Sequence, residues 1–182
     1  MNTVAPLRPI VGVMGSGSSD GGELAASLGS ALATLGVHLL TGAGRGTMTT
    51  VARAFVETPG RAGLSIGIVP STSVEAPEPL AGYPNPWIEI PIMTHLPHSG
   101  PSGTDTLSRN HINVLTSSVV IALRGAEGTR SEVELAVRYR KPVAWLLAEG
   151  SEPTVEAVPV FRDVDSAIGF VRTKTGATGN GG

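Results

Sequence analysis

The sequence predicts a single α/β domain of the Rossmann-like, doubly wound type, with a mainly parallel sheet. Short apolar segments alternate with amphipathic helical segments, which is the pattern of a parallel sheet covered by helices on both faces. Three of the strand-to-helix connections are rich in glycine, as tight turns at a sheet edge require. The chain has 182 residues, which is enough for one core and too short for two ordinary domains.

The first half of the chain supplies four predicted strands and two helices. A helix from about Asp20 to Leu35 begins with Asp20 and Glu23, which have the spacing of a capping box. The next helix places Met48 and Phe55 on one apolar face, together with the residues at helical spacing between them. The predicted strands span Ile10–Met14, Val37–Thr41, Leu64–Val69 and Trp87–Met93, the last interrupted at Pro91.

Two long segments in the middle of the chain are predicted to be irregular. Pro70–Pro86 contains five prolines, and His95–Thr104 is rich in small and turn-forming residues. Loops of this length in a compact domain are usually functional or disordered. We expect both loops to cover a ligand and shield it from water.

The second half completes the alternation of strands and helices. Asp105 is expected to cap a helix that buries either Leu107, His111 and Val114 or Ile112 and Leu115. A later helix is expected to bury Val133, Ala136 and Val137. The last helix begins at about Asp163. The domain is predicted to span residues 1–174, with a flexible, Gly-rich tail at 175–182. The remaining predicted strands are Ser118–Leu123, Val143–Leu147 and Val158–Phe161.

Composition argues against several classes of function. Thirteen basic and fifteen acidic residues give a net charge of −2, without the basic excess that nucleic-acid binding requires. The chain has no Cys, so it has no disulfide, no thiolate metal site and no cysteine nucleophile. No apolar run is long enough to cross a membrane. We therefore expect a cytoplasmic protein that binds neither nucleic acid nor membrane.

Three Gly-rich turns are the candidate binding elements: Gly15–Ser19, Gly42–Thr47 and Gly125–Thr129. Each opens a helix, where free backbone N–H groups and the helix dipole favour an anion. All three follow predicted parallel strands, so they are expected around one crevice at the carboxyl edge of the sheet. The chain lacks the full dinucleotide fingerprint and has no P-loop. The turns therefore predict a phosphate site of another kind.

These turns also carry a resemblance to a known family. Val13-Met-Gly-Ser-Gly-Ser18, Thr41-Gly-Ala-Gly-Arg-Gly-Thr-Met48, Ser108-Arg-Asn110 and the segment Gly125–Glu132 resemble the corresponding segments of one Rossmann-type group. That group contains the LOG proteins, often labelled lysine decarboxylases, and the molybdenum cofactor carrier proteins. The resemblance covers about residues 10–148.

The resemblance implies a ligand site in the three turns and in the segment ahead of the third. In the LOG enzymes, an Arg and the Glu that ends the motif P-G-G-x-G-T-x-x-E form a catalytic pair, which would fall on Arg109 and Glu132. The expected binding residues are Gly15, Ser16, Gly17, Ser18, Gly44, Arg45, Gly46, Thr47, Arg109, Arg124, Gly125, Glu127, Gly128, Thr129 and Glu132.

The chain departs from the hydrolase signature in two places. Arg124-Gly-Ala126 stands where the motif has Pro-Gly-Gly, and Asn110 stands where a basic residue follows the family's Arg. These departures favour the carrier-type relatives, so the leading hypothesis is a carrier of a phosphate-bearing pterin-type cofactor such as the molybdenum cofactor. The alternatives are a phosphoribohydrolase acting on nucleoside 5′-monophosphates and a nucleotide-sensing module. The resemblance also implies a homodimer or homotetramer, with a molybdoenzyme as a possible recipient.

Simpler roles are open for the same side chains. Thr129 and Glu132 have capping-box spacing, so Glu132 could serve the start of its own helix. Arg109 could form an ion pair at the surface or at an interface, and Arg45 and Arg124 could face solvent.

The remaining polar residues do not point to a metal or a serine nucleophile. His95 and His98 share a loop without a carboxylate or third ligand evident nearby, so no metal site is expected. His38, at the start of a strand, is expected to be structural. Ser16 lies in a turn that is not a nucleophile elbow, which argues against a serine hydrolase.

Overall fold

The computed structural model describes residues 7–177 and contains a seven-stranded sheet in the order β4-β3-β2-β1-β5-β6-β7. Every neighbouring pair of strands is parallel. The fold is therefore an α/β, Rossmann-like one, as predicted from the alternation of apolar and amphipathic segments. The strands are β1 (Ile10–Met14), β2 (His38–Thr41), β3 (Ser65–Val69), β4 (Ile90–Met93), β5 (Val119–Ala122), β6 (Val143–Leu146) and β7 (Val160–Phe161).

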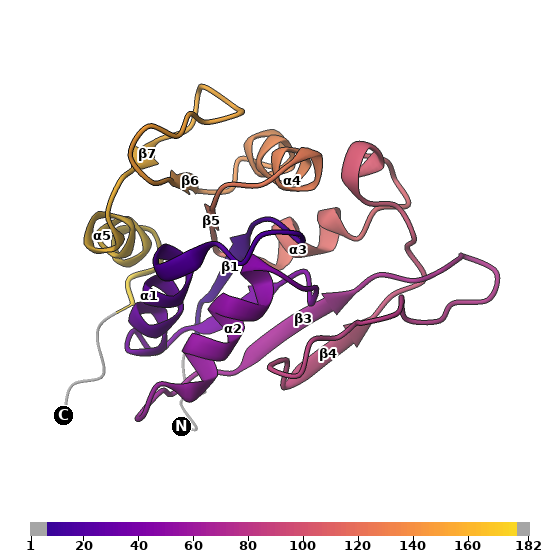
Figure 1. Cartoon of the computed structure of the whole chain (residues 1–182), viewed down its shortest axis with the longest axis horizontal. Helices are drawn as coiled ribbons and strands as arrows, with labels where there is room; N and C mark the ends of the chain where they lie inside the picture. The colour runs from indigo at the N-terminus through magenta and orange to yellow at the C-terminus, as the bar shows by residue number, and fades with distance from the viewer. Residues whose placement is uncertain (1–6, 178–182) are drawn as a thin grey trace, which may run out of the picture.

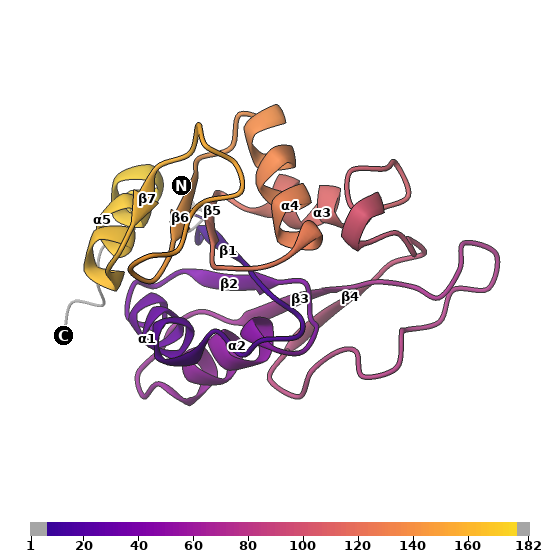
Figure 2. The ribbon, with the colours of Figure 1, turned by 45° about the horizontal axis from the view of Figure 1, so that its top comes forward.

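Helices cover both faces of the sheet, as Figures 1 and 2 show. One face packs against α1, α2 and α5, and the other against α3 and α4. In Figure 2, α1 and α2 lie below the strands while α3 and α4 lie above them. The helices are α1 (Gly22–Ala33), α2 (Thr47–Glu57), α3 (Asn110–Thr116), α4 (Glu127–Arg138) and α5 (Val164–Thr175), with a short 3-10 turn, η1 (Gly100–Ser102), before α3.

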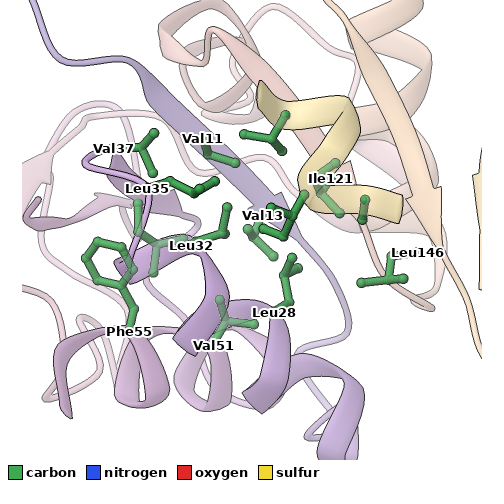
Figure 3. Close-up of a cluster of buried hydrophobic side chains, with 14 of the residues drawn as sticks. Val11, Val13, Leu28, Leu32, Leu35, Val37, Val51, Phe55, Ile121 and Leu146 are labelled. Atoms are coloured by element: carbon green, nitrogen blue, oxygen red, sulfur yellow. The ribbon is translucent and has the colours of Figure 1, made fainter. Parts of the chain in front are cut away.

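The core consists of two apolar layers, one on each face of the sheet. Side chains of a strand point alternately to the two faces, so Val11 and Val13 of β1 belong to the layer that contains α1 and α2. Met14 belongs to the opposite layer. Figure 3 shows Val13 near Leu28 of α1, and Phe55 of α2 farther along the same layer, beyond Leu32. Both faces of the central strands are buried, which explains why their sequences are almost continuously apolar.

Helices α1 and α2 pack closely at Gly29. A Cβ atom on this residue would overlap the backbone carbonyl oxygen of Val51, and it would lie 3.2 Å from the backbone nitrogen of Phe55. Because backbone atoms cannot move aside as a side chain does, the absence of a Cβ allows this close packing. The contact matters for the site, since α1 follows the first Gly-rich turn and α2 begins at Thr47, the last residue of the second.

Three predictions about helix ends and faces are wrong. The N-cap of α1 is Gly21 with φ of 72°, and Asp20 accepts a hydrogen bond from the Gly22 N–H instead of forming a capping box with Glu23. α3 begins at Asn110, so Asp105 does not cap it; the Asp105 carbonyl accepts from the Ser108 N–H. Val137 was expected to point inward, but it is 46% exposed.

The edges and the end of the domain also differ in part from the prediction. Strand β4 runs through Pro91, where an interruption was expected; proline is tolerated because β4 is the edge strand. Helix α5 ends at Thr175, and most of the predicted tail, residues 178–182, lies outside the described residues. None of the helices in residues 7–177 has the length and hydrophobicity to span a membrane.

Candidate functional site

The three Gly-rich turns leave the sheet at its carboxyl edge. Strands β2, β1 and β5 are neighbours and parallel, so the turns after Met14, Thr41 and Ala122 emerge on the same side. The chain after β1 continues into α1 on one face, whereas the chain after β5 continues into α4 on the opposite face. This change of direction between two adjacent strands is where open α/β sheets bind ligands.

The second Gly-rich turn is hydrogen-bonded to the first through Thr47. The Thr47 N–H donates to the Ser16 carbonyl at 2.9 Å, and the Thr47 hydroxyl donates to the Ser19 carbonyl at 3.0 Å. Thr47 is fully buried. Its polar groups are therefore engaged in holding the first turn in place.

A cavity of about 240 Å³ lies between the first turn, the third turn and the segment that precedes α3. Three residues from the irregular loops, Tyr83, Ser99 and Gly100, also line it. Each of the two irregular loops therefore contributes to the wall of this cavity. The predicted site residues that line this cavity are Gly15, Ser16, Gly17, Ser18, Arg109, Gly128, Thr129 and Glu132.

The other predicted site residues lie outside this cavity. Arg124 and Gly125, with Ser16, line a second cavity of about 480 Å³ on the other side of the first turn. Gly44 is buried beneath Tyr83, and Arg45 is exposed and lies against Gly82. The predicted site residues that line neither cavity are Gly44, Arg45, Gly46, Thr47 and Glu127.

Arg109 is the most unusual residue of the site, because its guanidinium is buried without adequate partners. The residue is 5% exposed, and its Nε and Nη1 atoms make no hydrogen bond within residues 7–177. The nearest carboxylate oxygen, Glu132 Oε1, is 3.9 Å from Nη1, which is too far for a hydrogen bond. The interpretation of Arg109 as a surface ion pair is therefore wrong.

Gly42 creates the space that the guanidinium occupies. A Cβ atom on Gly42 would lie 2.7 Å from Nη2 of Arg109 and 2.9 Å from Cζ, which is inside van der Waals contact. The glycine at the end of β2 thus determines where the positive charge sits. A buried donor without a partner costs free energy, so this position favours an anion that supplies the missing acceptors.

Glu132 faces Arg109 from α4 and is held by α3. The residue is 7% exposed, and Asn113 Nδ2 donates to Glu132 Oε1 at 2.7 Å. The N-cap of α4 is Ala126, so the interpretation of Glu132 as part of a capping box is wrong. Burial raises the pKa of Glu132 to about 7, although the charge of Arg109 and the Asn113 hydrogen bond act in the opposite direction.

The raised pKa of Glu132 predicts that anion binding depends on pH. Sulfate is a suitable probe because its own charge stays constant near neutral pH. Above pH 7 the ionised Glu132 lies beside Arg109 and repels the anion, so we expect sulfate affinity to fall by about tenfold or more between about pH 5.5 and about pH 8.5. Isothermal titration calorimetry measures this, and Glu132→Gln, which retains an acceptor for Asn113, is expected to remove the pH dependence.

The raised pKa of Glu132 also predicts a pH dependence of protein stability, which can be measured without a ligand. The pKa of Glu132 in the folded protein, about 7, is above its ordinary value of 4.5, so the folded state holds this proton more tightly than the unfolded state does. The contribution of Glu132 to the free energy of unfolding is therefore present below about pH 4.5 and is lost as the pH rises to about 7. Equal pH profiles of urea unfolding for the native protein and Glu132→Gln would contradict the raised pKa.

Several residues of the site were not predicted. Gly42 was assigned to a turn without a role, and Asn113 and Tyr83 were not considered. The sequence contains a weak signal for Tyr83, since it is an aromatic residue within a proline-rich loop that was expected to cover the ligand. For Asn113 the only signal is its position four residues after Arg109, which places both side chains on one side of the start of α3.

Three of the four histidines, His38, His98 and His111, have polar partners within the fold. His38 Nδ1 accepts from the Leu64 N–H at 3.0 Å, which confirms its structural role. His98 Nδ1 lies 3.4 Å from Asp105 Oδ2, so the assumption that no carboxylate is near this histidine was wrong. His111 Nδ1 lies 2.6 Å from the Tyr139 hydroxyl. Within residues 7–177, no group of three or more His, Cys, Asp or Glu residues could hold a metal ion.

The fold and the site define a Rossmann-like α/β protein with a buried Arg–Glu pair at the point where the strand order reverses. The sequence profile of the SLOG cluster4 family matches residues 8–169. The chain belongs to the SLOG cluster4 family, which confirms the LOG-like resemblance noted in the sequence. A search of curated proteins found no significant match.

Solved structures add relatives that match along nearly their whole length. The molybdenum cofactor binding protein of Rippkaea orientalis is 29% identical with a TM-score of 0.70, covering 92% of this chain and 97% of that one. The molybdenum cofactor carrier protein of Chlamydomonas reinhardtii is 30% identical with a TM-score of 0.70, covering 92% and 98%. DNA processing protein A of Helicobacter pylori, at 16% identity and a TM-score of 0.67, covers 92% and 81% and shares only the fold.

Proposed function

We propose that this protein binds and carries a phosphate-bearing, pterin-type cofactor such as the molybdenum cofactor. The observation that carries the proposal is the buried guanidinium of Arg109, whose Nε and Nη1 donors lack partners within residues 7–177. A phosphate group has the charge and the acceptor atoms to satisfy such donors, and arginine binds phosphate through two hydrogen bonds at once. A bound anion also stabilises the protein, because it compensates the buried positive charge of Arg109.

The two turns that line the cavity supply further contacts in this proposal. Gly128 and Thr129 lie in the first turn of α4, where backbone N–H groups without helical partners are available to an anion. Ser16 and Ser18 present hydroxyl groups from the first turn, and their Oγ atoms lie 3.1 Å apart. A carrier does not have to break any bond in its ligand. It needs only to bind the ligand, through these backbone N–H and hydroxyl groups and the loops that line the cavity.

The relatives support this choice of ligand. Two structures that match nearly the whole chain, at 29% and 30% identity, are described as a molybdenum cofactor binding protein and a molybdenum cofactor carrier protein. The homodimer or homotetramer, the molybdoenzyme recipient and the cytoplasmic location are predictions from the sequence alone.

Mass analysis of the native protein tests the proposal. The protein is purified from its source under anaerobic conditions, denatured, and its small-molecule fraction analysed by mass spectrometry and fluorescence after oxidation. We expect a phosphorylated pterin at a substantial fraction of one per chain, and its loss when Arg109→Met is purified in the same way. A native protein that carries no phosphorylated pterin and does not bind one when it is added would contradict the proposal.

One observation favours a second function, the release of a base from a nucleoside 5′-monophosphate. Glu132 has a pKa of about 7 and lies beside Arg109 in the same cavity, so it could exchange a proton at neutral pH as a general acid or base does. The substituted turn, Arg124-Gly-Ala126, argues for the carrier. We expect negligible release of adenine from AMP. Multiple turnovers that disappear in both Glu132→Ala and Arg109→Ala would show that the protein is a hydrolase.

A further inference from the structure

We propose that the second cavity is a subsite for the planar heterocycle of the ligand, a bicyclic ring of the purine or pterin kind. The phosphate end of the same ligand would lie in the first cavity with Arg109. This inference rests on the proposed function and adds to it where the ring binds and what class of ring it is.

The second cavity has the size and the walls of a pocket for a flat ring. It measures about 480 Å³ and lies beyond the carboxyl ends of β5 and β6. Its apolar walls come from Leu24 of α1, Leu123 after β5, and Leu146 and Leu147 at the end of β6. Apolar walls with a few polar groups at the rim are typical of sites that bind small organic molecules.

The two cavities adjoin one another. Ser16 and Ala126 line both, one from the first turn and one from the third. A single ligand that runs over these two residues would therefore reach both cavities. The first cavity, at about 240 Å³, is smaller than the roughly 300–1,000 Å³ usual for small-molecule sites, and the second supplies the missing space.

The polar groups of the second cavity suit an electron-rich, uncharged or anionic ring. Arg124 lines it, is exposed, and makes no side-chain hydrogen bond or ion pair within residues 7–177. A guanidinium without a fixed partner can stack on the face of an aromatic ring. Ser19 and Ser151 add hydroxyl groups, and no Asp or Glu lines this cavity. A cationic ligand is thus disfavoured.

A pair of probes that differ only by the base tests the proposal. Ribose 5-phosphate carries the sugar and phosphate, while GMP adds guanine, whose amino-oxo-pyrimidine ring is also present in pterins. We expect the native protein to bind GMP at least about tenfold more tightly than ribose 5-phosphate by calorimetry. Ala148 lines the second cavity and is exposed, so Ala148→Trp is expected to fill the pocket without disturbing the core. This variant should bind the two probes with nearly equal affinity.

Two further variants serve as a second filling replacement and as a control. Ser151→Trp fills the same cavity from another position and is expected to have the same effect. Ala157→Trp makes the same kind of exposed replacement beside a different hollow, near Pro142, and is expected to retain the preference for GMP. A preference for GMP that survives both filling variants would overturn the proposal, and so would equal affinities in the native protein. If the native protein binds neither GMP nor ribose 5-phosphate, the result contradicts the proposed phosphate site at Arg109 as well as the ring subsite.

Discussion

Replacement of Arg109 by methionine is expected to lower the affinity for sulfate by about a hundredfold. Methionine keeps much of the volume of the side chain and removes the buried charge and its unpaired donors. Removal of one partner of a buried, charged hydrogen bond typically costs about 2–5 kcal/mol, which corresponds to about thirtyfold to several thousandfold in affinity. Calorimetric titration at about pH 6, where Glu132 is largely protonated, gives the cleanest comparison.

Gly42→Ala provides the control for this prediction, because it changes the position of Arg109 and leaves the charge in place. A Cβ at Gly42 would lie 2.7 Å from Nη2, so the guanidinium has to move. We expect Gly42→Ala to weaken sulfate binding in the native background and to have little further effect in Arg109→Met. Additive effects in the double variant, or a native affinity in Arg109→Met, would show that the anion binds elsewhere.

Gly29→Ala is expected to destabilise the protein by about 2–3 kcal/mol, although alanine is the better helix former. The new Cβ would overlap the Val51 carbonyl oxygen and lie 3.1 Å from Ala54 Cβ, so α1 and α2 have to separate. Overpacking of this kind typically costs about 1–3 kcal/mol and occasionally more. Urea denaturation monitored by the fluorescence of the two Trp residues measures the change in the free energy of unfolding.

Gly169→Ala is the matched control for Gly29→Ala. Gly169 also lies inside a helix, α5, but nothing is within 4 Å of the Cβ that would be added. Here only helix propensity changes, and we expect a gain of about 0.5–1 kcal/mol. If both variants shift stability in the same direction, the close packing of α1 against α2 at Gly29 is not the cause.

The sequence was sufficient to predict the order of the elements and the edge of the sheet from which the three Gly-rich turns emerge. Strands such as Ile10–Met14 are apolar along their whole length because both of their faces are buried, and this pattern is visible without a structure. Glycine-rich turns after such strands are local features as well. Their convergence follows from parallel strand direction alone, so it required no knowledge of side-chain contacts.

The sequence was insufficient wherever a role depends on contacts between distant segments. Glu132 has the spacing of a capping residue, and only the approach of α3 to α4 shows that Asn113 and Arg109 face it. Gly42 and Arg109 are far apart in the sequence, and their contact has no sequence signal. The predicted start of α1 was also wrong. The N-cap is Gly21, whose φ is positive, and not the polar residue Asp20 that the sequence suggested.

Pro91 in the edge strand β4 restricts the ways in which a second copy of this chain could bind to the sheet. An exposed edge strand offers unpaired backbone groups to a second chain, which leads to sheet extension and aggregation. Proline removes one N–H donor from β4, and at the opposite edge β7 has only two residues. Neither edge is suited to continuous pairing between molecules. Assembly of this protein is therefore expected to use side-chain surfaces, such as exposed Ile92 and Met93, in preference to a shared sheet.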